Sequence, residues 1–232
     1  MRLDKVIIAL DFSKSKEALK IVDELDELIN FYKVGFGLFI SEGKKILKEL
    51  KKREKKIFLD LKFHDIPNTV QNAVRASYNL GVDMLTLHTT GGVEMMKKAR
   101  DVVEKARVKD NTSLKLLGVT ILTSIDGKMF KDIYTSTTSI SSLVKNLSLL
   151  AKEAGLDGVV ASAHEIDIIK KYCGKDFLVV TPGIRLEKLF NEDQKRTVTP
   201  REAFDRGADY IVIGRAVTSS KNPRETLLNI LK

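Results

Sequence analysis

Eight short runs of apolar residues recur along the chain, and segments with a different periodicity separate them. Each run is almost continuous in Val, Ile and Leu. This pattern is typical of strands that are buried on both faces of a parallel sheet, whereas half-exposed strands alternate apolar and polar residues. The runs are VIIALD at 6–11, YKVGF at 32–36, IFLDLK at 57–62, MLTLH at 84–88, KLLGVTIL at 115–122, GVVAS at 158–162, FLVVTPG at 177–183 and YIVIG at 210–214.

The segments between these runs carry apolar residues at the three-and-four spacing of amphipathic helices, most clearly at 14–29, 69–81, 92–108 and 140–155. Parallel strands require such helical crossovers. Eight strand–helix units in 232 residues predict an α/β protein with a single (β/α)8 TIM barrel. No linker or low-complexity stretch divides the chain, so we expect one domain over 1–232. An open doubly wound sheet is the alternative, but no GxGxxG follows the first run.

Composition narrows the class of protein. Hydrophobic residues make up 43% and charged residues 31% of the chain, as in folded soluble proteins. No apolar run approaches the ~20 residues of a spanning helix, and Asp11 interrupts the first run before a secretory signal can form. We therefore expect a cytoplasmic protein without a membrane partner. The single Cys173 and three scattered histidines predict neither a disulfide nor a metal site.

The net charge of +9 is high enough to attract nucleic acids or anionic metabolites. Much of the excess lies at 43–56, where Ile46, Leu47 and Leu50 keep a helical apolar stripe and lysines cover the opposite face. This pattern indicates a solvated helix. The chain has no Trp and only 6% aromatic residues, so it lacks the stacking residues of single-strand binders. We expect no nucleic-acid partner, although a charge-driven RNA binder stays as a distant alternative.

Polar residues stand at the ends of several predicted strands. Asp11 ends the first run, Lys33 lies in the second, Asp60 and Lys62 lie in the third, and His88 ends the fourth. Chemistry in TIM barrels is located at the carboxyl ends of the strands. Asp60 and Lys62 are two positions apart, which predicts that both side chains point to the same face. Taken alone, they could also form a structural ion pair at the rim of the barrel.

The segment DLKFHDIPNT at 60–69 carries the most specific signal. It resembles the hallmark of the orotidine 5′-phosphate decarboxylase family, which is Asp, any residue, Lys, two residues, Asp, Ile, Pro or Gly, one residue, Thr. Further segments match in the expected order, namely IALDF, YKVGFGLF, LHTTGG, VTILTS, VTPGIR, DQKRTVTP and ADYIVIGRAVT. Thr89, Thr90 and Ala216 depart from the family pattern, but none of them is a presumed catalytic group.

The resemblance implies decarboxylation of orotidine 5′-monophosphate to uridine 5′-monophosphate, the last step of de novo pyrimidine biosynthesis, without a metal or an organic cofactor. It assigns catalysis to Lys33, Asp60, Lys62 and Asp65, with Lys62 stabilising a carbanion at C6 and then protonating it. It also implies a homodimer. Asp65, Ile66 and Thr69 are expected to reach into the active site of the neighbouring subunit.

The resemblance also implies a set of substrate contacts. Asp11 and Lys33 are expected to bind the ribose, together with Thr69 of the neighbouring subunit, and Thr123 to bind the amide edge of the pyrimidine. The segment 184–200 is longer than the ~2 to 6 residues usual for such a connection and is expected to be a lid. The remaining substrate-binding residues, mostly for the phosphate, are Pro182, Arg185, Gln194, Gly214 and Arg215.

One alternative function lies close to this interpretation. A sibling enzyme such as 3-hexulose-6-phosphate synthase shares Asp, Lys and Asp on the third strand but uses Mg²⁺. The complete DLKFHDIPNT together with DQKRTVTP favours the decarboxylase. None of the histidines is assigned to catalysis. His64 is expected to be exposed or capping, His164 to lie on the surface at a helix start, and His88 to support the site or to lie in the core.

Overall fold

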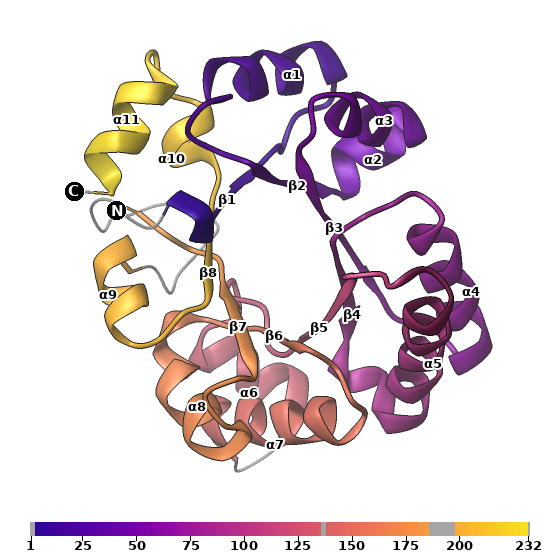
Figure 1. Ribbon diagram of the computed structural model, residues 1–232. Coiled ribbons are helices and arrows are strands. Elements are labelled where there is room, and N and C mark those ends of the chain that lie inside the picture. Colours follow the sequence, from indigo (N-terminus) through magenta and orange to yellow (C-terminus); the bar gives the residue numbers. More distant parts are fainter. Residues whose placement is uncertain (1–2, 136–137, 186–197, 232) are drawn as a thin grey trace.

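The chain folds into a closed barrel of eight parallel strands surrounded by helices (Figure 1). The computed structural model describes residues 3–135, 138–185 and 198–231. The barrel closes because β1 pairs with β8 as well as with β2, so the predicted TIM barrel is confirmed and the open sheet is wrong. The strands are β1 Val6–Ala9, β2 Phe31–Gly35, β3 Lys56–Phe63, β4 Met84–His88, β5 Lys115–Val119, β6 Gly158–Val160, β7 Leu178–Thr181 and β8 Tyr210–Ile213.

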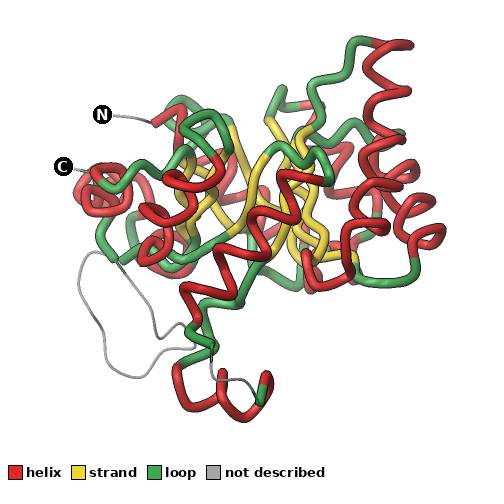
Figure 2. Tube along the Cα trace, turned by 90° about the horizontal axis from the view of Figure 1, so that it is seen from below, coloured by secondary structure: helices red, strands yellow, loops and turns green. Residues whose placement is uncertain are grey.

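Helices lie outside the ring of strands, in the ribbon view of Figure 1 and in the tube view of Figure 2. The four predicted helical segments correspond to α1, α4, α5 and α7, and the lysine-rich segment contains α3. The α-helices are α1 Ser15–Glu24, α2 Phe36–Glu42, α3 Lys44–Lys52, α4 Pro67–Tyr78, α5 Gly92–Asp110, α6 Gly127–Tyr134, α7 Ile140–Glu153, α8 Ile166–Cys173, α9 Pro200–Asp205, α10 Arg215–Thr218 and α11 Pro223–Ile230. Short 3₁₀ helices are η1 Leu3–Lys5, η2 Thr89–Gly91 and η3 Ala163–Glu165. No helix in the described part of the chain has the length and hydropathy to span a bilayer.

The strands separate two apolar layers. Alternate residues such as Ile8, Tyr32 and Leu59 pack outward against the helices. The intervening residues fill the inside of the barrel, and these are Ile7, Ala9, Phe31, Phe58, Met84, Leu117, Val180 and Val212. Two positions beyond Phe31 and Phe58 come Lys33 and Asp60. Because side chains two apart share a face, the inside of the barrel changes from apolar to charged toward the carboxyl ends of the strands.

A Gly–apolar–Asp motif precedes three even-numbered strands at the opposite, amino-terminal end of the barrel. It occurs as GVD at 81–83, GLD at 155–157 and GAD at 207–209. Each glycine has a positive φ, between 71° and 98°, and residues that carry a side chain seldom adopt this conformation. Each Asp carboxylate accepts a backbone N–H from the preceding strand, at 2.8 Å from Ile57, 2.8 Å from Leu116 and 2.7 Å from Val179. The motif therefore joins neighbouring strands where the helices return to the barrel.

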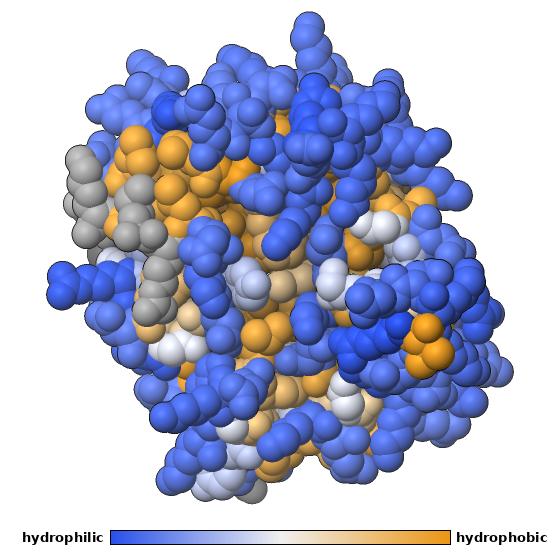
Figure 3. All heavy atoms as spheres, in the orientation of Figure 1, coloured by the Kyte–Doolittle hydropathy of each residue, from blue (hydrophilic) through white to orange (hydrophobic). Residues whose placement is uncertain are grey.

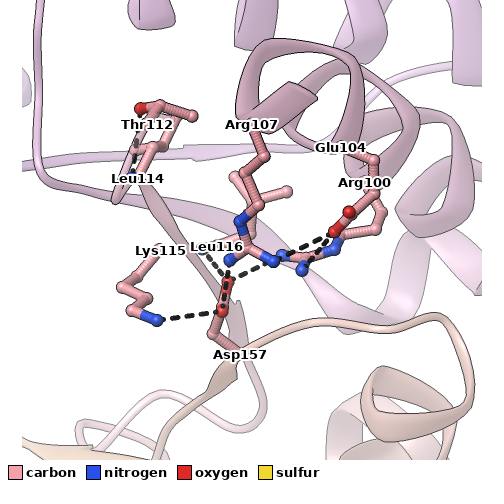
Figure 4. Close-up of polar contacts among 8 residues, drawn as sticks. All are labelled: Arg100, Glu104, Arg107, Thr112, Leu114, Lys115, Leu116 and Asp157. Atoms are coloured by element: carbon pink, nitrogen blue, oxygen red, sulfur yellow. Dashed lines mark hydrogen bonds and ion pairs between the residues drawn. The ribbon is translucent and has the colours of Figure 1, made fainter. Parts of the chain in front are cut away.

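The second of these motifs gathers additional cations (Figure 4). Arg100 and Arg107 of α5 contact the Asp157 carboxylate at 3.0 and 3.1 Å, and the Lys115 Nζ lies 3.5 Å away. Glu104 pairs with both arginines. The cluster fixes α5 against β5 and β6. This amino-terminal end faces the reader in Figure 3, where hydrophilic side chains cover most of the rim and apolar atoms show near the centre.

Candidate active site

A cavity of about 330 Å³ opens at the carboxyl ends of the strands. Its volume lies within the range of ligand pockets in proteins. Its floor is apolar and its wall carries charged side chains. The lining residues are Ala9, Asp11, Lys33, Phe58, Asp60, Lys62, Val119, Ile121, Leu122, Thr123, Ser124, Val160, Ala161, Pro182, Gly183, Arg185, Val212, Gly214 and Arg215. Nine of the residues predicted from the sequence therefore line one cavity.

Four of these side chains form a chain of alternating charge. The Lys33 ammonium contacts the Asp11 carboxylate at 2.9 Å and lies 3.7 Å from the Asp60 carboxylate. The Lys62 ammonium contacts the same Asp60 oxygen, Oδ2, at 2.9 Å. Lys33 and Asp60 are each 12% exposed in their side chains, whereas Lys62 is 26% exposed. A side chain at Gly35 would press on the Lys33 ammonium, because a Cβ there would lie 3.1 Å from it.

The backbone of β3 is irregular where it carries Asp60 and Lys62. The pairing of β3 with β4 shifts between Leu59 and Phe63, and Lys62 adopts a φ of +44°. Non-glycine residues seldom adopt this left-handed conformation. The sequence argument placed both side chains on one face of a regular strand. They do meet, but on an irregular strand, which is a common way to re-aim side chains beside an active site.

Asp60 is held as a carboxylate. Burial acts to raise the pKa of this carboxyl, but the charges of Lys33 and Lys62 and the hydrogen bonds from Lys62 and Thr86 outweigh burial and lower the pKa below its ordinary value. Its Oδ1 accepts a hydrogen bond from the Thr86 hydroxyl at 2.9 Å. Both carboxylate oxygens thus accept hydrogen bonds, which fixes the orientation of the Asp60 side chain.

The far wall of the cavity carries two arginines. Arg185 is buried at 7% exposure, and its backbone and guanidinium both donate hydrogen bonds, to the carbonyl oxygens of Val198 and Ile184. Arg215 is exposed and begins α10, directly after Gly214. Pro182 and Thr123, which are expected to bind the substrate, also line the cavity. Gln194 lies outside the described residues.

Three predicted residues do not line this cavity. Asp65, Ile66 and Thr69 are exposed around the start of α4, and the Asp65 carboxylate accepts a hydrogen bond from the N–H of Ile66 at 2.7 Å. Within the chain, the array of alternating charge consists of Asp11, Lys33, Asp60 and Lys62. The expectation that these three residues serve the neighbouring subunit stays a prediction.

The three histidines differ in their surroundings. His64 is exposed and His164 is exposed in η3, as expected. His88 ends β4 and is half-buried, with its ring centroid 5.2 Å from that of His64. Burial lowers the pKa of His88, and the charges of His64 and Lys62 lower it further against an opposing effect of Asp60. Because Lys62 and Asp60 act on its pKa, His88 lies near the charged side chains of the site. This position favours a supporting role over a place in the core.

Sequence reasoning did not single out several residues of the site. Ile121, Leu122 and Ala161 line the cavity beyond the ends of β5 and β6, but their apolar character resembled that of the strands themselves. Thr86 was missed as well. It bonds to both Asp60 and Lys62. A lone Thr inside the apolar run MLTLH was its sole sequence signal.

Comparison with known proteins identifies the family. The family model described as "Orotidine 5′-phosphate decarboxylase / HUMPS family" matches residues 4–230. The chain belongs to this family. The orotidine 5′-phosphate decarboxylase of Legionella pneumophila (strain Paris) is 46% identical over 228 residues, which cover 98% of each chain. That of Carboxydothermus hydrogenoformans is 45% identical over 221 residues, 95% of this chain and 92% of the relative.

Solved structures of similar proteins share the fold of this family member. The crystal structure of orotidine 5′-phosphate decarboxylase from Lactobacillus acidophilus has a TM-score of 0.83 and 36% identity, with 97% of this chain and 96% of that chain covered. An uncharacterized conserved protein from Geobacillus kaustophilus gives a TM-score of 0.84 at 36% identity, with 97% and 98% covered. The resemblance inferred from DLKFHDIPNT is thus confirmed at the level of the family.

Proposed function

We propose that the protein decarboxylates orotidine 5′-monophosphate to uridine 5′-monophosphate without a cofactor, in the last step of pyrimidine biosynthesis. The observation that carries the proposal is the alternating array of Asp11, Lys33, Asp60 and Lys62 in a cavity that Arg185 and Arg215 also line. It combines a rigid ammonium group with cations suited to a phosphate. Family membership and the names of the curated relatives support the same reaction.

The chemical problem is an unsupported negative charge. Loss of carbon dioxide leaves an electron pair on C6 in the plane of the pyrimidine ring, where the π system cannot disperse it. Lys62 is the group proposed to stabilise this carbanion electrostatically and then to transfer a proton from its ammonium to C6. The 2.9 Å contact with Asp60 supports this role, because it fixes the ammonium before the substrate arrives.

Repulsion by Asp60 is too weak to carry the reaction. In this proposal the carboxylate of the substrate lies beside the Asp60 carboxylate. Two like charges 4 Å apart repel each other by about 4 kcal/mol at an effective dielectric of 20. Very slow reactions require a barrier reduction on the order of 20 kcal/mol. Attraction between Lys62 and the carbanion, together with binding energy from the distant phosphate, therefore supplies most of the effect in this proposal.

The other proposed contacts bind the phosphate, the ribose and the pyrimidine of the substrate. Arg185, Arg215 and the backbone near Gly214 are proposed to bind the phosphate with Gln194, since the last strand-end loops of TIM barrels often hold phosphate. Asp11 and Lys33 are proposed to bind the ribose hydroxyls. Further contacts are assigned to Thr123, at the amide edge of the pyrimidine, and to Pro182.

A homodimer that shares its active sites completes the proposal. Asp65, Ile66 and Thr69 would enter the neighbouring cavity, which is consistent with their exposure away from the cavity of their own chain. Ile66 is 67% exposed, and Phe36 and Ile40 of the preceding α2 are 50% and 78% exposed. Apolar side chains that gather into one exposed patch mark a surface that a partner covers.

Turnover of orotidine 5′-monophosphate by the purified protein tests the reaction. We expect the absorbance change of pyrimidine decarboxylation, unaffected by excess EDTA. The same preparation is assayed as a 3-hexulose-6-phosphate synthase with Mg²⁺. Activity that appears only in that second assay would assign the chain to the magnesium-dependent branch.

Subunit mixing tests the shared site. Lys62→Ala and Asp65→Ala proteins are inactive alone in this proposal, but a hybrid dimer keeps one intact site. Random exchange at equal amounts should restore about a quarter of the wild-type activity, because half of the dimers are hybrids with one site each. Lack of recovery after exchange, verified by native mass spectrometry, would contradict a site shared between subunits.

A further inference from the structure

Thr86 lies on β4 directly opposite the irregular part of β3. Leu85 pairs with Leu59 and Leu87 pairs with Phe63, so Thr86 alone faces the three residues 60–62. A regular ladder cannot satisfy the backbone groups of these extra residues. Thr86 is completely buried and lies two positions beyond Met84, which points into the barrel. Its side chain therefore lies on the inner face of the sheet, level with the charged layer.

The Thr86 hydroxyl joins the two charged residues of β3. Its Oγ1 accepts a hydrogen bond from the backbone N–H of Lys62 at 2.9 Å and donates to Asp60 Oδ1, also at 2.9 Å. The direction of both bonds is fixed. A backbone N–H can only donate, and the hydroxyl has one proton, which therefore goes to Asp60. Asp60 must accept this bond, which it does as a carboxylate.

We propose that Thr86 is a positioning residue for Lys62. Its hydroxyl holds the backbone of Lys62 in the left-handed conformation, with φ at +44°, and at the same time holds the carboxylate that orients the Lys62 ammonium. Thr86 does not line the cavity, so it acts through Lys62 and Asp60 and not on the substrate itself. This inference rests on the proposed decarboxylase function and assigns that site a further residue.

The test compares Thr86→Val with Thr86→Ser. Valine keeps the shape of threonine and removes both hydrogen bonds, whereas serine keeps the hydroxyl. We expect kcat for orotidine 5′-monophosphate to fall about 10- to 100-fold in Thr86→Val with KM within about threefold, because misplacing a catalytic group acts mainly on the chemical step. Thr86→Ser should recover most of kcat. Thr86→Ala, which crowds the barrel less, is assayed in parallel in case Thr86→Val does not fold.

Thr89→Val is the matched control. Thr89 is equally buried, but its hydroxyl donates to the carbonyl oxygen of Val119 and contacts neither Asp60 nor Lys62. It should lose stability and keep kcat within about twofold. A similar loss of kcat in Thr89→Val and Thr86→Val would overturn the proposal, and so would failure of serine to rescue.

A crystal structure of Thr86→Val supplies a readout that does not depend on activity. We expect the Lys62 backbone to leave the left-handed region and its ammonium to move away from Asp60. Retention of both features would overturn the proposal whatever the kinetics. Wild-type protein without turnover of orotidine 5′-monophosphate would instead refute the proposed function, so the two failures are distinguishable.

Discussion

The two ends of the barrel use the same residue types in different arrangements. At the amino-terminal end, Asp157 is surrounded by two arginines and a lysine and also accepts the backbone N–H of Leu116. At the carboxyl end, Asp60 contacts two lysines and a threonine, all through side chains. Asp157 joins a helix to two strands, whereas Asp60 lines a cavity.

This difference predicts that Asp157 contributes mainly to the stability of the fold and Asp60 mainly to turnover. A carboxylate that accepts backbone N–H groups holds elements of the fold together, and its loss leaves those buried donors unsatisfied. A carboxylate bonded through side chains alone fixes the position and charge of those side chains and accepts no backbone N–H itself. The amino-terminal acidic residues should therefore act on unfolding and the carboxyl-terminal ones on turnover.

The largest expected effect tests the carboxyl end. Lys62→Ala should lower kcat/KM by about 10⁴-fold or more, because in the proposed mechanism it removes both the electrostatic stabilisation and the proton donor. Its free energy of unfolding should change by less than about 1 kcal/mol, since the Lys62 side chain is partly exposed and Asp60 keeps Lys33 and Thr86 as partners. Steady-state kinetics and urea unfolding measure the two quantities on one preparation.

Lys170→Ala is the matched lysine control at the other end. Its ammonium contacts Asp209 at 2.6 Å and donates to the carbonyl oxygens of Lys175 and Phe177. This variant should lose stability and keep its turnover. Near-normal turnover of Lys62→Ala in a clean preparation would show that the proposed mechanism is wrong.

Asp157→Ala should give the largest loss of stability. The substitution leaves three cations without their shared carboxylate and the N–H of Leu116 without its acceptor. Removing one partner from a largely buried ion cluster typically costs about 3 kcal/mol. Urea unfolding measures this loss, and kcat of the folded fraction should stay within about twofold of wild type. A large fall in kcat at unchanged stability would contradict the separation between the two ends.

The fold was largely predictable because each strand is buried on both faces. The apolar runs identified all eight strands, but several of them extended too far at the carboxyl end. The run at 115–122 extends beyond β5, which ends at Val119, because Ile121 and Leu122 leave the ladder and line the cavity. The run at 177–183 extends beyond β7, which ends at Thr181. The strand ends there because Pro182 has no N–H to donate to the ladder. Apolar character alone does not distinguish a strand from the wall of a pocket.

The charged residues of the site could be predicted from the sequence, whereas the features that depend on backbone conformation could not. Asp60 and Lys62 stand out because a core excludes charged residues. The left-handed backbone of Lys62 had no signal, since Lys is not a residue that favours this region. Thr86 had only a weak signal, a lone Thr inside the apolar run MLTLH, because threonine is common in strands for its shape alone. Its role appears only when the strand opposite is known to be irregular.

The smallest expected effect concerns the pH dependence of stability. His88 ends β4 beside Lys62 and Asp60, and its pKa is lowered by burial and by the charges of His64 and Lys62. The unfolded chain has an ordinary histidine pKa of about 6.5, so it binds more protons than the folded protein between that value and the lower folded pKa. Stability should therefore fall as the pH decreases below about 6.5.

His88→Gln should flatten this part of the profile by a few tenths of a kcal/mol, as measured by urea unfolding from pH 7 to pH 5. His164→Gln, which removes an exposed histidine far along the chain, should leave the slope unchanged. Equal flattening in both variants would mean that burial of His88 at the carboxyl end does not determine the slope.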